Sequence, residues 1–508
     1  MASRAPNVIL IMVDTLRADR LSCYGYRRLT SPRLDAFADE SVLYAAAISP
    51  GVWTPPSHAS IFTGTYPSRH GVDRTHPYLD GSFTVLPEYM QRHGYRTFGI
   101  SSSFWIDTAT RFDRGFDVFR QSWQLLQTGS NPPLERQRRR APGYRGPSAP
   151  RGLGEELRSA ANRVDVAFWR RCCQPIMAVD KGAGRVNRVV RRWIRQWATM
   201  DEPVFAYIHY MEPHLPYRPP AWSRHRHLGV RAEARARTVN QHAPKFISGR
   251  ARMGAEELDI LGQLYDAEVS YTDDCIGELL DSLRTSRLLE RSIVIVTSDH
   301  GENLGEHGLM DHMFSVHEPV VHVPLIIRYP GRAYRGVEGG LVQTHDIFPT
   351  VVAILEDAGT RLGNGQNGHH GPNGFDRSQF QGGPLPPFGV PRDFAITELN
   401  DIQPPISTLT SRYPYFDWTP FDRRLRAVRT LTHKYVRAST GAEELYAVVK
   451  DPGEFRNIAA TERTRTAQLR AWLDTWEAGI PRAGARAEDR TGATTRGRRP
   501  HAPSDIPG

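Results

Sequence analysis

Four side chains in this sequence could together hold a divalent metal ion. Asp14 ends the apolar run NVILIMV, and Asp299 and His300 follow the apolar run SIVIVTS. Thr54 stands before two prolines in the stretch WTPPSHASIFTG. Carboxylate, imidazole and hydroxyl donors together favour Zn²⁺ or Mn²⁺, with Ca²⁺ as an alternative. A threonine hydroxyl bound to such an ion loses its proton more readily, so Thr54 is a candidate nucleophile.

The elements that must position these residues alternate between strands and helices. Apolar runs typical of buried strands occur in NVILIMVD, RTFGISSS, PVFAYIHY, SIVIVTSDHG and VPLIIRYPG. Helical periodicity lies between them, in SPRLDAFADES, LPEYMQRHG, RVNRVVRRWIRQWA and ELDILGQLYDAEVSYTDDCIGELLDSL. This alternation predicts an α/β fold, a mostly parallel sheet sandwiched by helices. Working residues of such sheets gather where strands end, so Asp14, Asp299 and His300 are expected to meet there.

The sequence divides into a large domain, a small one and a tail. We predict a catalytic domain over residues 1–385, a C-terminal α+β subdomain over 386–481, and a disordered tail over 482–508. Arg- and Pro-rich stretches near 128–155 and 218–250 are interpreted as insertions. In the subdomain, HKYVRA and EELYAVV predict paired strands, and TRTAQLRAWLDTWEAG predicts an amphipathic helix.

Locally, the helix near Thr54 is expected to begin after Ser57, a favoured N-cap, which would place Thr54 beside its N-terminus.

Composition narrows the class of protein. A chain of 508 residues with 39% hydrophobic residues can bury a large core, which excludes a fibrous or wholly disordered protein. The net charge of +10 comes from arginine, which either attracts anionic partners or forms a solvated surface. The four cysteines lack ligand spacing, so no disulfide framework is predicted. No signal peptide or membrane span is evident, and the predicted location is the cytoplasm.

Taken in order, several motifs resemble those of the sulfatase family in the alkaline phosphatase superfamily. They are NVILIMVDTLRADRLSCYGY, WTPPSHASIFTGTYPSRHG, HYMEPHLPYRPP, TSDHGENLGEHG, VHEPVVHVPLIIRYPG, THDIFPTVV and THKYVRASTGAEELYAVVKDPGEFRNIA. The resemblance spans roughly residues 6–475 apart from the insertions. It implies an alkaline phosphatase-like fold and an ester hydrolase of class EC 3.1.

The resemblance implies a metal centre at the residues already singled out. Asp14 matches the acidic ligand after the first strand, and Asp299 and His300 match the ligand pair of the Ser-Asp-His-Gly motif. Thr54 matches the cysteine or serine that typical sulfatases convert to formylglycine, and would complete the ligands.

Three histidines are implied as further catalytic residues. His58 stands where the formylglycine motif has its arginine. His214, in EPHLPY, resembles the substrate-binding histidine of the family, and His312 lies near a lysine commonly found before the position of His317.

The departures from the family pattern change the expected chemistry. Threonine is not converted to formylglycine, Thr15 replaces a second aspartate, and His300 replaces the usual asparagine. The set instead resembles threonine-nucleophile phosphodiesterases and phosphoryl transferases of the same superfamily, which form a phospho-threonine intermediate.

The leading hypothesis is a metal-dependent hydrolase that cleaves phosphate, phosphodiester or phosphonate esters, with sulfate esters also considered, through Thr54. The alternatives are a sulfuric ester hydrolase, a phosphoryl-group transferase and a non-catalytic sulfatase-like binding protein. The expected partner is an anionic small-molecule ester; no nucleic-acid motif occurs, and the oligomeric state is left open.

The roles of five further residues stay open at this point. His209 either faces the site or packs in a buried layer, and Glu212 either orients His214 or is a loop carboxylate. Arg17 either adds charge to the site or is structural, and His307 and His345 have no separable role.

Overall fold

An eight-stranded sheet forms the centre of the molecule in the computed structural model, which describes residues 5–124, 181–361 and 375–480. Its strands lie in the order β10-β2-β9-β6-β1-β5-β3-β4. All neighbours are parallel except those of β9, which runs antiparallel to β2 and β6. The predicted mostly parallel sheet is therefore confirmed. The bounds of its strands are β1 Asn7–Val13, β2 Val42–Ile48, β3 Arg96–Ser101, β4 Val118–Gln121, β5 Val204–Tyr210, β6 Ser292–Ser298, β9 Leu325–Arg328 and β10 Gly336–Gln343.

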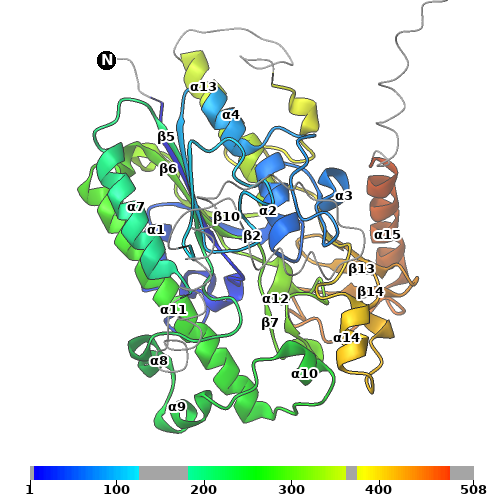
Figure 1. The fold of residues 1–508 in the computed structure, drawn as a ribbon. Coiled ribbons are helices and arrows are strands. Elements are labelled where there is room, and N and C mark those ends of the chain that lie inside the picture. The colour runs from blue at the N-terminus through cyan, green and yellow to red at the C-terminus, as the bar shows by residue number, and fades with distance from the viewer. Residues whose placement is uncertain (1–4, 125–180, 362–374, 481–508) are drawn as a thin grey trace, which may run out of the picture.

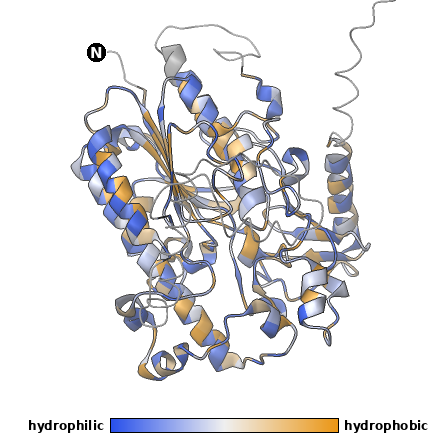
Figure 2. Cartoon of the chain, in the orientation of Figure 1, coloured by the Kyte–Doolittle hydropathy of each residue, from blue (hydrophilic) through white to orange (hydrophobic). Residues whose placement is uncertain are grey.

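Helices cover both faces of this sheet (Figure 1), and the sequence of β1 shows why. Every residue of β1 is buried. Ile9, Ile11 and Val13 pack with α7 and α11, whereas alternate residues of the strand pack on the other side with α2, α4 and α13. Because side chains alternate along a strand, an unbroken apolar run is needed to face two helical layers. Figure 2 accordingly shows the central strands in the colour of hydrophobic residues.

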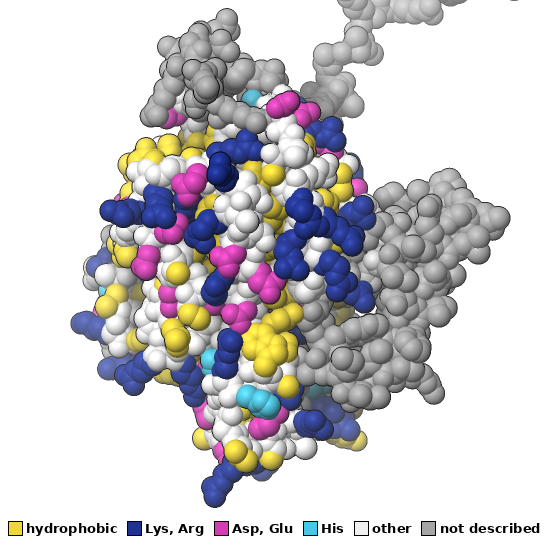
Figure 3. Space-filling model, turned by 90° about the vertical axis from the view of Figure 1, so that its left-hand side faces the viewer, with side chains coloured by type: hydrophobic (Ala, Val, Ile, Leu, Met, Phe, Trp, Pro, Cys, Tyr) yellow, Lys and Arg dark blue, Asp and Glu magenta, His cyan; other side chains and the backbone are white. Residues whose placement is uncertain are grey.

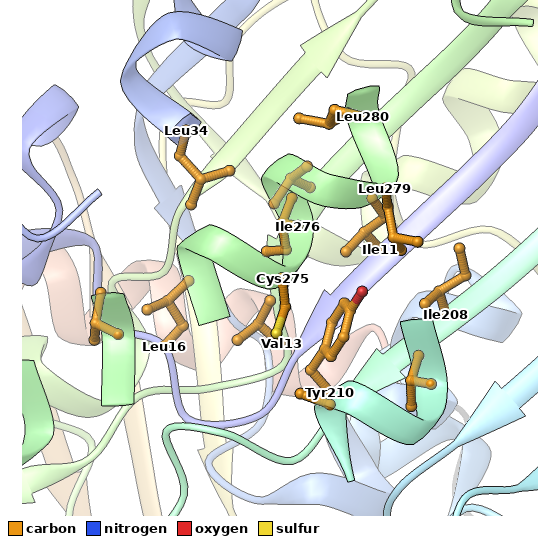
Figure 4. Packing of buried hydrophobic residues seen from close by; sticks show 14 of the residues in the cluster. Ile11, Val13, Leu16, Leu34, Ile208, Tyr210, Cys275, Ile276, Leu279 and Leu280 are labelled. Atoms are coloured by element: carbon orange, nitrogen blue, oxygen red, sulfur yellow. The ribbon is translucent and has the colours of Figure 1, made fainter. Parts of the chain in front are cut away.

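The helical layer on one face packs closely against the central strands. Figure 4 shows Cys275, Ile276 and Leu279 of α11 in one buried cluster with Ile11 of β1 and Tyr210 of β5. The helices of the structure have the following bounds: α1 Pro32–Ala38, α2 Thr54–Thr63, α3 Pro67–His70, α4 Leu86–Arg92, α7 Ala183–Trp197, α8 Ala221–His227, α9 Val230–Ala236, α10 Ala243–Ile247, α11 Ala255–Thr285, α12 Glu318–Val321, α13 Ile347–Arg361, α14 Ile406–Arg412 and α15 Arg463–Ala478.

A separate four-stranded antiparallel sheet forms the C-terminal subdomain. Its strands are β11 Ala395–Leu399, β12 Leu425–Arg429, β13 Lys434–Ala438 and β14 Glu443–Tyr446. The predicted pairing of β13 with β14 is confirmed. Helix α15 buries Leu469 against this sheet, with Trp472 and Trp476 partly buried beside it. The fold class predicted from the sequence, including a small α+β subdomain, is thus observed.

Other predictions of organisation have mixed outcomes. Residues 218–250 contain the short helices α8, α9 and α10, whereas 128–155 and 482–508 lie outside the described residues. The boundary at 385 stays a prediction. Cys23 and Cys275 are free thiols, as expected. Among the helices described, none combines the length and apolar composition needed to cross a membrane.

The face formed by α7 carries mixed charge. Figure 3 shows Lys and Arg side chains there, interspersed with Asp and Glu side chains. Helix α7 turns Arg188, Arg191, Arg192 and Arg195 outward while its apolar residues face the sheet. This arrangement fits the solvated-surface interpretation of the arginine excess.

Candidate active site and metal centre

Asp14, Asp299 and His300 meet at the edge of the large sheet where β1 and β6 end. The two strands are parallel neighbours in register, with Val13 beside Ser298, so the residues that follow them emerge side by side. The Ser298 hydroxyl ties the two loops together. Its Oγ lies 2.6 Å from the Val13 carbonyl oxygen and accepts a hydrogen bond from the amide of Leu16. The predicted meeting of these residues at one strand edge is observed.

Thr54 is the first residue of α2, and Trp53 is the N-cap. The expected helix start after Ser57 is therefore wrong. Pro55 and Pro56 explain the difference, because proline fits the first turn of a helix, where amide hydrogens have no partner inside the helix. The positive end of the α2 dipole consequently lies at Thr54 and favours negative charge on its oxygen.

The side-chain nitrogen Nε2 of His300 lies at the centre of three oxygen atoms. It is 3.4 Å from Thr54 Oγ1, 3.3 Å from Asp299 Oδ2 and 3.7 Å from Asp14 Oδ1. The other ring nitrogen, Nδ1, donates a hydrogen bond of 3.0 Å to the Gly301 carbonyl. Nε2 therefore carries a lone pair directed at the oxygens.

These distances and lone pairs fit a divalent metal ion. Two ligands at about 2.1 Å from a tetrahedral ion lie about 3.4 Å apart, close to the separations around His300. Ligand atoms of Asp14, Asp299 and His300 all lie within 4.8 Å of one another. The hydrogen bond from Nδ1 to a backbone carbonyl also matches the usual support of a metal-binding histidine.

The electrostatics of the site show uncompensated negative charge. No residue that the structure describes donates a hydrogen bond to either carboxylate oxygen of Asp14, which is buried. Burial raises the pKa of Asp14 well above its usual value, and the charge of Asp299 raises it further. Burial also lowers the pKa of His300 to about 3, which keeps the ring neutral and able to bind a metal ion.

Asp299 is held in one orientation by its surroundings. Its Oδ1 accepts hydrogen bonds from the amides of His300 and Thr15, at 3.0 and 3.4 Å. Its Oδ2 is the atom that faces His300 Nε2. Burial would raise the pKa of Asp299, but His300 and His58 together hold it below its usual value.

His58 and His209 each contact one of the two carboxylates proposed to bind metal, Asp299 and Asp14 respectively. His58 Nδ1 donates to the Thr54 carbonyl at 2.9 Å and lies 3.4 Å from Asp299 Oδ2. His209 Nδ1 accepts a hydrogen bond from the Ser102 amide, so Nε2 carries the proton and points toward Asp14 Oδ2, 3.8 Å away. His209 therefore sits in a packed layer and also contacts the site, so both interpretations of this residue apply.

A second group of potential ligands adjoins the first. His214, Glu302 and His312 have ligand atoms within 4.8 Å of one another. The rings of His300 and His312 are 4.3 Å apart between centroids. Sequence reasoning missed Glu302, although it stands two residues after His300 in the Ser-Asp-His-Gly motif.

The remaining sequence candidates lie outside this arrangement. Arg17 forms ion pairs with Asp19 and Glu306 and donates a hydrogen bond to the Glu302 carbonyl, so it supports the loop that carries Glu302. Glu212 accepts a hydrogen bond from the Lys181 amide and is a loop carboxylate. His307 Nε2 donates a hydrogen bond of 2.9 Å to the Gly453 carbonyl, and His345 Nε2 accepts one of 3.1 Å from Arg392 Nη2.

Known proteins resemble this chain over most of its length. The sulfatase family model matches residues 6–358. An uncharacterized sulfatase, YidJ, of Escherichia coli is 24% identical over 72% of this chain and 70% of its own length. Iduronate 2-sulfatase of Homo sapiens is 28% identical over 69% of this chain and 65% of its own.

Solved structures show the same fold. The phosphonate monoester hydrolase of Agrobacterium radiobacter superposes with a TM-score of 0.61, at 22% identity, over 94% of this chain and 96% of its own. Because the family model covers more than half of the 508 residues, the chain belongs to the sulfatase family, and it is a sulfatase-like ester hydrolase.

Proposed function

We propose that this protein hydrolyses phosphate, phosphodiester or phosphonate esters of small anionic molecules, with Thr54 as an unmodified nucleophile. One observation carries the proposal. The Thr54 hydroxyl oxygen lies 3.4 Å from Nε2 of the neutral His300, near two buried carboxylates and at the N-terminus of a helix. A hydroxyl beside a potential base, at the positive end of a helix dipole, is in the environment of an activated nucleophile.

The donor set supports a divalent metal ion held by Asp14, Thr54, Asp299 and His300. Two carboxylates, one hydroxyl and one imidazole favour Zn²⁺ or Mn²⁺ over Ca²⁺, which prefers oxygen ligands alone. When bound, such an ion polarises the phosphoryl group and stabilises the ionised oxygen of Thr54.

The reaction then proceeds in two steps at Thr54, assisted by other residues of the chain. The Thr54 hydroxyl gives its proton to water, its oxygen attacks phosphorus, and the bond to the leaving-group oxygen breaks, so that this oxygen takes a proton from water. A second water molecule then attacks phosphorus and releases phosphate, a phosphate monoester or a phosphonate, according to the substrate, and Thr54 regains its proton. The α2 dipole stabilises the ionised hydroxyl, and the two prolines that follow Thr54 limit movement of the backbone. His58 holds Asp299 in place through the contact between Nδ1 and Oδ2.

His214 and His312 lie next to His300 and are proposed to contact the substrate. Their rings are 5.3 Å apart between centroids. Among the proposed site residues, His214 has the partly exposed position, whereas Thr54, Asp14 and His300 are buried. A substrate that reaches Thr54 therefore approaches past His214, and its non-bridging oxygens develop charge near these two histidines.

The second candidate function is hydrolysis of sulfate esters, which membership of the sulfatase family favours. Phosphoryl and sulfuryl groups are both tetrahedral, but phosphate esters carry more negative charge. A site that joins a metal ion to the positive end of a helix dipole should prefer the more anionic group.

Peptide mass spectrometry after brief exposure to matched aryl phosphate, phosphodiester, phosphonate and sulfate esters tests the proposal. We expect a phosphoryl adduct on the peptide that contains Thr54. Thr54→Ala should lose the adduct and lower turnover about 10³-fold or more, whereas Thr54→Ser should keep a measurable adduct. Robust turnover of sulfate esters, with none of the matched phosphorus esters, would overturn the proposed substrate class.

A further inference from the structure

His214, Glu302 and His312 form a second cluster of potential metal ligands, in which Glu302 and His312 are buried and His214 is partly exposed. One ligand atom from each residue lies within 4.8 Å of the other two. His312 Nδ1 is 3.4 Å from Glu302 Oε1. Two imidazoles and one carboxylate are a known set of protein ligands for Zn²⁺, with a further position open to water or substrate.

The hydrogen bonds around this cluster leave atoms available for a cation. His214 Nδ1 contacts the Leu215 carbonyl at 2.5 Å, where it acts as the donor, so its Nε2 keeps a lone pair. Glu302 Oε2 accepts a hydrogen bond from the Tyr217 hydroxyl. Glu302 Oε1 is buried and accepts no hydrogen bond from any residue in the described part of the chain. This buried oxygen has an ion-pair contact with His312 Nδ1 but no hydrogen bond, so it can accept a cation as a further partner.

The balance of charge leads to the same conclusion. Asp14, Asp299 and Glu302 are all fully buried, and Asp311 adds a fourth carboxylate 2.9 Å from His312. Two basic side chains touch the backbone of the cluster: Lys181 Nζ donates to the His214 carbonyl and Arg17 Nη1 to the Glu302 carbonyl. Their ion pairs are formed with other carboxylates, Lys181 with Glu268 and Arg17 with Asp19 and Glu306. In the described part of the chain, the carboxylates of Glu302 and Asp311 therefore share His312 as their ion-pair partner.

Asp311 also fixes the orientation of His312. Its Oδ1 accepts a hydrogen bond of 2.7 Å from the His312 amide and lies 2.9 Å from the ring nitrogen Nδ1. Glu302 Oε1 lies 3.4 Å from the same ring nitrogen, so two carboxylates converge on His312. Buried carboxylates gathered at one place are typical of a site that holds a cation.

From this geometry we infer that His214, Glu302 and His312 bind a second divalent metal ion, beside the ion held by Asp14, Thr54, Asp299 and His300. The rings of His300 and His312, 4.3 Å apart between centroids, place the two ligand groups next to each other. Paired ions in such an arrangement act on both the attacking and the leaving oxygen of a phosphoryl transfer. The inference deepens the proposed function, on which its catalytic meaning rests. Under this inference, His214 and His312 contact the substrate through the second ion that they bind.

The number of bound ions per chain tests the inference. The full-length protein is stripped of metal, loaded with Zn²⁺ or Mn²⁺, dialysed, and measured by native mass spectrometry and elemental analysis. We expect about two ions per chain in the wild type and about one in His312→Lys and in Glu302→Gln. His307→Gln is the matched control, because His307 lies outside both ligand groups and should leave the count at about two.

A magnetic measurement adds a readout that does not depend on stoichiometry. Two Mn²⁺ ions on adjoining ligands are magnetically coupled, so the wild type should give a broadened, coupled electron paramagnetic resonance spectrum. His312→Lys should give the spectrum of an isolated Mn²⁺ ion. Thermal unfolding confirms that each variant is folded. If His312→Lys fails to fold, Glu302→Gln provides the comparison, and Asp299→Asn, which removes a ligand of the other ion, should also bind about one.

The outcomes separate this inference from the proposed function. One ion in the wild type together with a phosphoryl adduct on Thr54 would overturn the second site and leave the proposed function standing. Two ions without an adduct on any phosphorus ester would support the second site and overturn the function. An unchanged count in both His312→Lys and Glu302→Gln would overturn the assignment of these ligands.

Discussion

Two clusters of buried charged residues in this molecule are balanced in opposite ways. In the active-site cluster, made of Asp14, Asp299, His300 and their neighbours, the carboxylates face neutral histidines. The second, which we call the salt-bridge cluster, consists of Glu318, Arg429, Lys434 and Glu454. Lys434 Nζ lies 3.2 Å from Glu318 Oε1 and 2.5 Å from Glu454 Oε1, and Arg429 Nη2 lies 3.2 Å from Glu318 Oε2.

The pKa shifts show the same contrast. Burial tends to raise the pKa of Glu318, but Lys434 and Arg429 hold it well below its usual value. Burial raises the pKa of Asp14, and Asp299 raises it further. The salt-bridge cluster is therefore complete within the chain, which joins α12 to the C-terminal sheet through its own cations. In the active-site cluster, Asp299 is stabilised by His300 and His58, whereas the carboxylate of Asp14 accepts no hydrogen bond from the described residues. The proposed metal ion would supply the positive charge that Asp14 lacks, and the two clusters would then differ in whether buried charge is structural or binds metal.

The largest expected effect is the loss of Lys434 from the salt-bridge cluster. Lys434→Met would leave the Glu318 and Glu454 carboxylates buried near each other with Arg429 as their remaining close cation. We expect the free energy of unfolding to fall by about 3–5 kcal/mol, measured by denaturant titration. The exposed Lys450→Met is the control and should change stability little. A change below about 1 kcal/mol for Lys434→Met would show that the cluster contributes little to stability.

Removal of metal should affect the active-site cluster and leave the salt-bridge cluster unchanged. With free Zn²⁺ or Mn²⁺ at about 100 times its dissociation constant, the metal should stabilise the folded protein by about 2.7 kcal/mol. Thermal unfolding with and without a chelator measures this increment. Lys434→Met should retain the increment, and Asp299→Asn should lose the part of it that comes from the ion at Asp14 and Asp299. Equal increments in those two variants would contradict the contrast between the clusters.

His209 is expected to act on the metal centre through Asp14. The proton on its Nε2 points toward Asp14 Oδ2 at 3.8 Å, and its ring stacks on Tyr207 at 6.2 Å between centroids. His209→Gln should weaken metal binding about 10–100-fold, as replacing a partner of a metal ligand usually does. Isothermal titration with Zn²⁺ measures the affinity. His345→Gln, at an equally buried histidine away from the metal centre, should leave it unchanged.

Much of the active-site cluster could be predicted from the sequence, because its residues follow strands with a strong hydrophobic signal. The runs of β1 and β6 are apolar throughout, and parallel neighbours bring Asp14, Asp299 and His300 together. The strand β2 was missed, since VLYAAAI contains three alanines, which have weak strand preference. The antiparallel direction of β9 also has no signature in a short apolar run.

The parts of the site that could not be predicted depend on contacts between distant segments. Glu302 is held by Tyr217, which stands 85 positions earlier in the chain, and its burial has no local signal. The two roles of His209 could not be separated, because alternation along β5 gives its face but not its contact with Asp14. The start of α2 was misplaced because Ser57 matched the preference for an N-cap, whereas the prolines favour an earlier start.

The smallest expected effect is on the stability of the metal-free protein when Asp14 loses its charge. Asp14→Asn removes the repulsion between Asp14 and Asp299, so the metal-free variant should be more stable than the metal-free wild type at neutral pH, by on the order of 1 kcal/mol. Metal binding, which needs the ionised carboxylate, should be weakened by the same change. The equivalent change in the salt-bridge cluster, Glu318→Gln, should lower stability instead, because it leaves Lys434 and Arg429 with less negative charge.

The pH dependence of the stability of the metal-free protein tests independently whether Asp14→Asn stabilises it. The folded-state pKa of Asp14 is raised, so its favourable contribution in the metal-free protein is complete below the unfolded value of 3.8 and is lost as pH rises through the raised pKa. The folded-state pKa of Glu318 is lowered, so its contribution is present above the unfolded value of 4.5 and is lost as pH falls through the lowered pKa. Unfolding curves of metal-free protein across this range should show that Asp14→Asn gains stability over the wild type as pH rises. If the stability gained by Asp14→Asn does not depend on pH, Asp14 is not the group that titrates. The pKa of Asp14 would then no longer distinguish the active-site cluster from the salt-bridge cluster.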